Sequence, residues 1–400
     1  MKPASISLLI VDDDPVFTRF VRQLVQSLGS ELPCIAQSAG TAGAALAELA
    51  RNAYELVLLD YNLPDGDGLQ VLAQIRTLAP EQQPAVIMLT ASGSEAVAVE
   101  AMKRGAKDYL TKANLDMPSL MRAVQSALAQ KRLAGQVAAY HAQMEAELQM
   151  ARNLQQSLFP DRYPVFPGSA APEKSALQFC HRFYPAQHLA GDFFSVLSLS
   201  DTRAAVFICD VMGHGVRSAL VTAMLRAWVE DLAPETTDPA HFLGELNRRL
   251  ARVFKQNDGL MFATAFYLVA DLAAGTMHYA NAGHPRPLHF QHAAGMVSPL
   301  PLPPHPGPAL GLFEDAGYLG GQCPLLRGDR LLLFTDGLFE VMDTAGEIGF
   351  GQERLLAAAS ARTQLAPAGL LDGLVAEARA FSGGAEFGDD VCLLAMEVKA

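Results

Sequence analysis

Residues 191–210, GDFFSVLSLSDTRAAVFICD, decide how the second half of this chain folds. Two apolar runs flank a Ser-Asp-Thr turn, which predicts an antiparallel β-hairpin. Asp192 begins the first run and Asp210 ends the second, and each lies nine residues from Asp201 in the turn. Because facing residues of a symmetric hairpin are equidistant from its turn, Asp192 and Asp210 are predicted to lie side by side at the open end.

The pattern around this hairpin extends it into an antiparallel sheet that carries helices. TAFYLVADLAAGTMHYANAG (264–283) has a second pair of apolar runs around a turn, and VRSALVTAMLRAWVEDL (216–232) and LGELNRRLARVF (243–254) are typical of helices. PLPLPPHPGP (299–308) holds six prolines, so it is predicted to be a loop. These patterns predict an α+β domain over residues 161–400, in which an antiparallel sheet carries helices.

The first part of the chain has a different period. Between residues 6 and 130, short apolar runs such as SLLIV, YELVLL, AVIML and DYLTK alternate with helical stretches. This alternation predicts an α/β domain over 1–130 that is built of repeated strand-helix units around a parallel sheet. Residues 116–160 are predicted to form a helical connector. Apolar side chains recur there at seven-residue spacing, at Val137, Met144, Ala151 and Leu158, which indicates a coiled coil and a homodimer.

Composition limits the functional classes. The 400 residues suit two domains with a connector, and the formal net charge of −12 disfavours nucleic acid as a partner. The five cysteines are scattered and indicate neither a disulfide framework nor a thiolate zinc site. No apolar run reaches the roughly 18 residues of a membrane span, and the N-terminal pattern is not typical of a signal peptide. A soluble, cytoplasmic protein without membrane contact is expected.

Polar side chains cluster at the ends of the strands predicted in 1–130. In a parallel sheet these carboxyl ends share one edge, where ligands bind. Converging carboxylates repel one another unless a hard divalent cation neutralises them, and a nearby lysine and hydroxyl would complete a site for an oxyanion. The residues concerned are Asp12, Asp13, Asp60, Thr90 and Lys112.

These residues lie in the motifs VDDDP (11–15), LLDYNLPDGDG (58–68), LTAS (89–92) and KDYLTK (107–112), which resemble the receiver domains of bacterial response regulators in order and spacing. The resemblance implies a doubly wound, parallel five-stranded α/β fold, phosphorylation by a cognate sensor histidine kinase and a bound Mg²⁺ ion. It implies these roles: Asp60 as phosphoacceptor, Asp12, Asp13, Asp60 and the Asn62 carbonyl as Mg²⁺ ligands, Lys112 as partner of the phosphoryl oxygens, Thr90 as switch hydroxyl and Tyr109 as the aromatic that follows Thr90 inward.

Aspartates also occupy strand ends in the second domain. Besides Asp192 and Asp210, Asp336 follows RLLLFT, and Asp389 and Asp390 precede VCLLAMEV. Neighbouring carboxylates without lysine or arginine between them are costly unless they bind metal, and all-oxygen donors favour Mg²⁺ or Mn²⁺ over structural zinc. Two such ions sharing a bridging aspartate can activate water for attack on a phosphoryl group.

The motifs AGDFFSV (190–196), CDVMGHGVRSAL (209–220), LLLFTDGLFEVMDTAGEIGFGQERL (331–355) and GDDVCLL (388–394) resemble the metal-dependent protein phosphatase (PPM) family, in particular the bacterial partner-switching branch. The resemblance implies an antiparallel β-sandwich flanked by helices. It also implies a two-metal (Mn²⁺ or Mg²⁺) serine/threonine phosphatase acting on a phosphorylated regulatory protein, such as an anti-sigma factor antagonist. Asp210 would bridge the ions, with Asp192, the Val211 carbonyl, Asp336, Asp389 and Asp390 around it. Two positions depart from the family pattern, Ala190 in place of glycine and Ser195 in place of an acidic residue.

Two questions stay open on the sequence. His214 is either a general acid for the leaving oxygen or a member of its own loop's hydrogen bonds. The whole chain is either a phosphatase controlled by phosphorylation of Asp60, or an adaptor whose inactive phosphatase-like domain binds a sigma factor or its regulator. The retention of Asp192, Asp210, Asp336 and Asp389 favours the phosphatase, since a docking surface alone does not need them.

Overall fold

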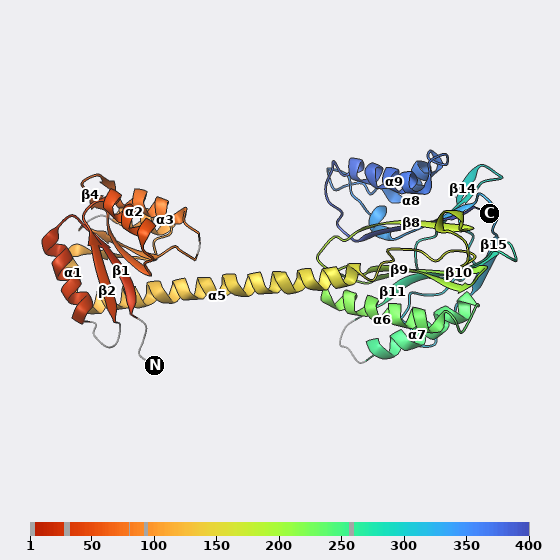
Figure 1. Cartoon of the computed structure of the whole chain (residues 1–400), viewed down its shortest axis with the longest axis horizontal. Coiled ribbons are helices and arrows are strands. Elements are labelled where there is room, and N and C mark those ends of the chain that lie inside the picture. The colour runs from red at the N-terminus through yellow and green to blue at the C-terminus, as the bar shows by residue number, and fades with distance from the viewer. Residues whose placement is uncertain (1–4, 28–32, 80, 92–94, 256–259, 400) are drawn as a thin grey trace. The chain divides into compact units, whose positions relative to one another are not determined.

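The structure is a computed structural model that describes residues 5–27, 33–79, 81–91, 95–255 and 260–399 (Figure 1). Ser92 of the LTAS motif lies outside these residues. The chain divides into two compact units, Met1–Glu145 and Ala146–Ala400, and each is described here by itself. The predicted domain limits at residues 130 and 160 stay predictions. No helix within the described residues is both long and apolar enough to cross a membrane.

The first unit contains a five-stranded parallel sheet in the order β2-β1-β3-β6-β7, which confirms the predicted fold class. Its strands are β1 (Ile6–Val11), β2 (Cys34–Ala39), β3 (Leu56–Asp60), β6 (Ala85–Thr90) and β7 (Asp108–Thr111). A small hairpin follows β3 and consists of β4 (Asn62–Leu63) and β5 (Gly66–Asp67). The apolar pattern did not reveal β2, because this edge strand, CIAQSA, is largely accessible and has Ile35 as its one large apolar side chain.

Helices cover both faces of this sheet. One buried core joins it to α1 and the start of α5, and the other joins it to α2, α3 and α4. The helices are α1 (Pro15–Ser27), α2 (Ala42–Arg51), α3 (Gly68–Arg76), α4 (Glu95–Lys103) and α5 (Met117–Gln156). Because β1, β3 and β6 are buried from both sides, their sequences are continuous apolar runs. The long helix expected over 116–158 is α5.

The second unit contains two five-stranded antiparallel sheets, in the orders β15-β12-β11-β10-β9 and β14-β13-β16-β17-β8. The strands of the first sheet are β9 (Asp192–Ser200), β10 (Arg203–Val211), β11 (Ala263–Asp271), β12 (Thr276–Ala282) and β15 (Gly320–Pro324). Those of the second are β8 (Leu177–Tyr184), β13 (Leu288–Gln291), β14 (Met296–Pro299), β16 (Arg330–Phe334) and β17 (Val391–Val398). The proline-rich segment is a loop beyond Pro299, which ends the edge strand β14.

Three apolar cores order this unit into four layers. One core packs the first sheet against α6 (Val216–Leu232) and α7 (Pro239–Phe254), and a second fills the space between the sheets. The third packs the second sheet against α8 (Gly351–Ser360) and α9 (Pro367–Phe381). Figure 1 shows the two helix pairs on opposite outer faces of the sandwich. The predicted sandwich flanked by helices is confirmed.

The β9–β10 hairpin has the predicted register, with Asp192 opposite Asp210. A local irregularity at Arg203 and Ala204, beside the turn, leaves that pairing unchanged. Phe194 and Ile208, each two residues inward from one of the aspartates, belong to the core between the sheets. Since side chains alternate along a strand, Asp192 and Asp210 lie on the face directed toward the second sheet.

Candidate functional sites

The receiver carboxylates converge at one edge of the parallel sheet. Asp12 follows β1 and Asp60 ends β3, and both side chains are buried. One ligand oxygen from each of Asp12, Asp13 and Asp60 lies within 4.8 Å of the others. Lys112, after β7, places its Nζ 2.6 Å from Asp12 Oδ2 and 2.8 Å from Asp60 Oδ2. Three carboxylates therefore face one ammonium group, a charge balance that suits a bound divalent cation.

Burial and charge act in opposite directions on this group. Burial raises the pKa of Asp60, while the hydrogen bond and charge of Lys112 oppose that rise. Burial alone would lower the pKa of Lys112, but its interactions with Asp12 and Asp60 raise it above the ordinary lysine value. Lys112 thus stays protonated and positioned to neutralise added negative charge on Asp60.

The remaining predicted receiver residues differ in burial and in their distance from this cluster. Asn62 lines a cavity of about 370 Å³ together with Asp13, Asp60 and Lys112. Thr90 is buried at the end of β6, one strand from Asp60. Tyr109, by contrast, is 45% exposed, so its side chain is on the surface. An inward movement of Tyr109 stays a prediction.

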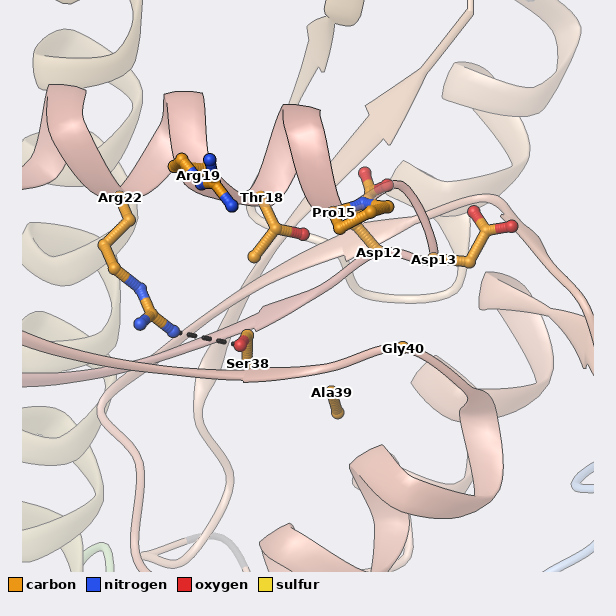
Figure 2. Close-up of a pocket in the computed structure, with 9 residues that line it drawn as sticks. All are labelled: Asp12, Asp13, Pro15, Thr18, Arg19, Arg22, Ser38, Ala39 and Gly40. Atoms are coloured by element: carbon orange, nitrogen blue, oxygen red, sulfur yellow. Dashed lines mark hydrogen bonds between the residues drawn. The ribbon is translucent and has the colours of Figure 1, made fainter.

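A second cavity of about 350 Å³ borders Asp12 and Asp13 (Figure 2). Figure 2 shows Asp12 and Asp13 at one end, and the Arg22 side chain of α1 extending toward β2 at the other. The Arg22 Nη2 donates to Ser38 Oγ at 2.9 Å. This bond fixes one guanidinium on the α1 side of the acidic cluster.

In the second unit, a buried threonine orients the first aspartate of the hairpin. Thr335, which follows β16, donates from Oγ1 to Asp192 Oδ2 at 2.6 Å. The same oxygen accepts the Cys392 N–H at 2.9 Å. Thr335 therefore connects β9 of one sheet to β17 of the other at the end where Asp336 leaves β16. Sequence reasoning missed this residue, although its place directly before Asp336 was a usable signal.

Asp390 fixes the chain segment that leads into β9. Its Oδ1 accepts the Ala186 N–H at 2.8 Å and its Oδ2 accepts the Gly191 N–H at 2.7 Å. Both oxygens are thus engaged with backbone amides, which fits a positioning role better than direct metal binding. Gly337 packs against the same loop, where an added Cβ would lie 2.1 Å from the Asp390 carbonyl oxygen.

The electrostatics of these aspartates indicate mutual repulsion. Burial, followed by the charges of Asp210 and Asp390, raises the pKa of Asp192 well above its ordinary value. Burial and then the charges of Asp336 and Asp389 raise the pKa of Asp210 to about 7. Burial also raises the pKa of Asp336. Such shifts require the carboxylates to lie close enough to interact.

The donor set fits divalent cations. Among the described residues, no lysine or arginine forms an ion pair with any of these five aspartates. Within the same part of the chain, a group of three acidic side chains within 4.8 Å occurs in the first unit alone, so the carboxylates of the second unit are more widely spread. Gly191 permits a close backbone approach there, since an added Cβ would lie 2.5 Å from the Val211 carbonyl oxygen.

Three other predicted positions lie apart from the aspartates. His214 is exposed, and its Nε2 lies 3.4 Å from Gln187 Nε2. Ser195 lies on the face of β9 opposite to Asp192. This is the face of Phe193, which packs toward α6 and α7. The serine therefore leaves the Asp192 face unchanged. Ala190 is fully buried and contacts the last turn of α5.

That contact involves Gln155, which sequence reasoning did not single out. The Gln155 Oε1 accepts the Ala190 N–H at 2.9 Å, and its Nε2 donates to the Ala190 carbonyl at 2.8 Å. The same Nε2 lies 3.4 Å from Thr222 Oγ1 on α6. Gln155 is buried while its neighbours Leu154 and Gln156 are exposed. The end of α5 is thereby fixed two residues before Asp192.

A parallel sheet with clustered carboxylates at one edge, followed by a carboxylate-bearing antiparallel sandwich, defines a class of signalling protein, the receiver-linked PP2C-type chains. The response regulator receiver domain model matches residues 8–149, and the model for Stage II sporulation protein E (SpoIIE) matches residues 200–399, half of the chain. The chain therefore belongs to the SpoIIE family and carries a receiver domain before it.

Individual relatives agree with this assignment. Phosphoserine phosphatase RsbP of Bacillus subtilis is 29% identical over 195 residues, covering 48% of this chain and 45% of RsbP. Phosphoserine phosphatase RsbU of the same species is 28% identical over 199 residues, covering 50% of this chain and 55% of RsbU. The chain thus spans about half the length of these relatives. The SiaA-PP2C domain of Pseudomonas aeruginosa shares the fold, with a TM-score of 0.55 and 22% identity over 65% of this chain and 99% of that domain.

Proposed function

We propose that this chain is a response regulator whose second unit is a two-metal phosphatase for phosphoserine or phosphothreonine on a regulatory protein. The observation that carries the proposal is the pairing of Asp192 with Asp210 at the end of the sandwich, with their pKa values raised by neighbouring carboxylates. The names of RsbP and RsbU as phosphoserine phosphatases support the reaction.

Each candidate site residue of the second unit has a proposed role. Asp192, Asp210, Asp336 and Asp389 would hold two Mn²⁺ or Mg²⁺ ions, with Asp210 between them and the Val211 carbonyl beside it. When bound, the ions supply an activated water and offset phosphoryl charge. Thr335 orients Asp192, and Asp390 holds the 186–191 backbone rigid. The exposed His214 is proposed to protonate the leaving oxygen only when substrate covers it.

In the receiver, Asp60 would accept a phosphoryl group from a sensor histidine kinase. Asp12, Asp13 and the Asn62 carbonyl would hold Mg²⁺, and Lys112 would pair with the phosphoryl oxygens. Thr90, buried one strand away, would supply the hydroxyl that responds to the new charge. The short Lys112 contacts to Asp12 and Asp60 support this assignment.

The decisive experiment is a Mn²⁺-dependent assay on a phosphoserine protein with Asp210→Asn as the matched variant. Loss of one bridging carboxylate is expected to lower kcat at least about 100-fold, which corresponds to roughly 3 kcal/mol of transition-state stabilisation. Wild-type protein that releases no phosphate, yet binds a regulatory partner equally well with and without Asp210, would establish the adaptor function instead.

We further propose that α5 carries the signal. The helix contains residues of both compact units, and the side-chain amide of Gln155 in its last turn joins it to Ala190. Activity measured with and without a beryllofluoride mimic on Asp60 tests the control. Replacing the middle of α5 with a Gly/Ser linker should abolish the difference between the two states.

The same helix is proposed to pair with a second copy. Leu133, Val137, Tyr140 and Met144 follow a four-three-four spacing, and each is at least 40% exposed. An apolar seam of this period buries itself against another helix. Sedimentation should therefore give a dimer for the full chain and a monomer for Val137→Glu, whereas an unchanged mass for both would refute pairing through this seam.

A further inference from the structure

We propose that a cavity of about 540 Å³ beside the carboxylate cluster binds an acidic side chain of the substrate protein next to its phosphorylated residue. The inference rests on the proposed phosphatase function and names what recognises the substrate. The cavity lies within the second unit, between the end of α5, the chain after β8 and the chain after α9. Its charged and aromatic lining comprises Arg152, Tyr184, His188, Arg379, Glu386 and Phe387.

The cavity borders the proposed reaction centre through one shared segment. Residues 184–188 line the cavity, and Gly191 and Asp192 follow three and four residues later. Asp390 accepts the N–H groups of both Ala186 and Gly191, so the segment is fixed at each end of this short path. A polypeptide whose phosphorylated side chain reaches Asp210 therefore has its neighbouring residues near the cavity.

Two guanidinium groups give the cavity its charge. Arg379 lies 4.8 Å from the Tyr184 ring centroid and 5.2 Å from that of Phe387, so aromatic faces on two sides hold it. Eight other arginines among the described residues of the unit pair with carboxylates, as Arg182 does with Asp372 at 2.7 Å. Within the described residues, neither Arg152 nor Arg379 forms such an ion pair.

This arrangement favours an anionic occupant. Arg152 and Arg379 outnumber Glu386, the acidic lining residue, in a chain whose formal net charge is −12. A guanidinium binds a carboxylate through two parallel hydrogen bonds, and the flat rings of Tyr184 and Phe387 accept the aliphatic stem of an aspartate or glutamate. The metal ions would take the phosphoryl group itself, so the arginines remain available to a flanking side chain.

The cavity also assigns a task to α5. Arg152 lies one helical turn before Gln155, the residue that fixes α5 to Ala190. The helix that is proposed to carry the signal would thus supply part of the substrate site. A shift of its last turn would then change substrate affinity together with order at Asp192.

The test uses full-length protein and paired phosphoserine peptides that differ only in aspartate or asparagine beside the phosphoserine. Wild type is expected to favour the aspartate peptides about 5-fold to 10-fold in kcat/KM, mainly through KM. Arg379→Gln and Arg152→Gln should each remove most of that preference and leave p-nitrophenyl phosphate hydrolysis within about 2-fold of wild type. Arg248→Gln, an exposed arginine on α7, is the control with the same charge change.

Three results would overturn the inference. The first is a wild-type protein without any preference for aspartate peptides, and the second is a preference that both arginine variants keep. The third is a loss of p-nitrophenyl phosphate hydrolysis in the variants as large as their loss of peptide hydrolysis, which would place the arginines on the phosphoryl group. Peptide binding to Asp210→Asn protein, followed by fluorescence anisotropy, tests the same preference without turnover. Absence of hydrolysis in wild type would then refute the phosphatase function alone, while the binding preference still decides this inference.

Discussion

Gln155→Ala removes both hydrogen bonds that join the last turn of α5 to Ala190, at 2.8 and 2.9 Å. A net contribution of about 1 kcal/mol for each bond gives roughly 2 kcal/mol. Ala190 is fully buried, so its N–H and carbonyl are left without partners, and this raises the expected loss to about 2–4 kcal/mol. Because Ala190 lies two residues before Asp192, metal activation should weaken as well.

The single tryptophan makes this loss measurable in the intact chain. Trp228 lies in α6 and packs against the core of the second unit, so its fluorescence during urea unfolding reports on that unit. Gln156→Ala is the matched control, since Gln156 is exposed on the same turn. If Gln155→Ala and Gln156→Ala agree in both the free energy of unfolding and the Mn²⁺ concentration for half-activation, Gln155 does not fix the site and the reasoning fails.

Two further substitutions test packing and charge in the second unit. Gly337→Ala places a Cβ 2.1 Å from a backbone oxygen and should lower the free energy of unfolding in urea by at least about 2 kcal/mol. Gly388→Ala is the control, because an added Cβ there has nothing within 4 Å, and it should lower this free energy far less. Equal losses would contradict the close packing at Gly337. Burial lowers the pKa of His284 to about 3, so the unfolded chain takes up a proton below about pH 6.5 while the folded chain does not. His284 therefore contributes stability that is complete above pH 6.5 and is lost as the pH falls toward 3, about 2 kcal/mol by pH 5. Between pH 7 and pH 5, the free energy of unfolding of His284→Gln should therefore fall by about 2 kcal/mol less than that of the wild type. An equal fall in both proteins would refute the role of His284.

The parts of the site that follow from local geometry were predictable. Asp192 and Asp210 are equidistant from a tight turn, and a short hairpin leaves little freedom in register, so counting residues placed them side by side. The receiver carboxylates were equally accessible to prediction, because parallel strands present their carboxyl ends at one edge. In both cases the backbone between the residues fixes their separation.

The parts that depend on docking between distant elements were not predictable. Gln155 contacts a residue 35 positions away, and Arg379 meets Tyr184 across most of the second unit. A glutamine in a helix and an arginine near a helix end are ordinary in sequence. Only the packing of α5 and α9 around the segment after β8 gives these side chains particular partners. Tyr109 illustrates the same limit, because its exposed position depends on packing that its motif does not specify.

The segment from Tyr184 to Asp192 would let one helix affect both the proposed substrate binding and the proposed chemistry. Its start lines the cavity, Asp390 holds its middle, and Gln155 holds Ala190 near its end. Asp192 then enters β9, where its register with Asp210 is fixed by the hairpin. Since the sheet is rigid and the segment is short, displacement of the last turn of α5 cannot be absorbed along the way. It must either break the Gln155 contacts or move the backbone that carries Asp192, and the second alternative changes the spacing of the carboxylates that are proposed to hold the two ions.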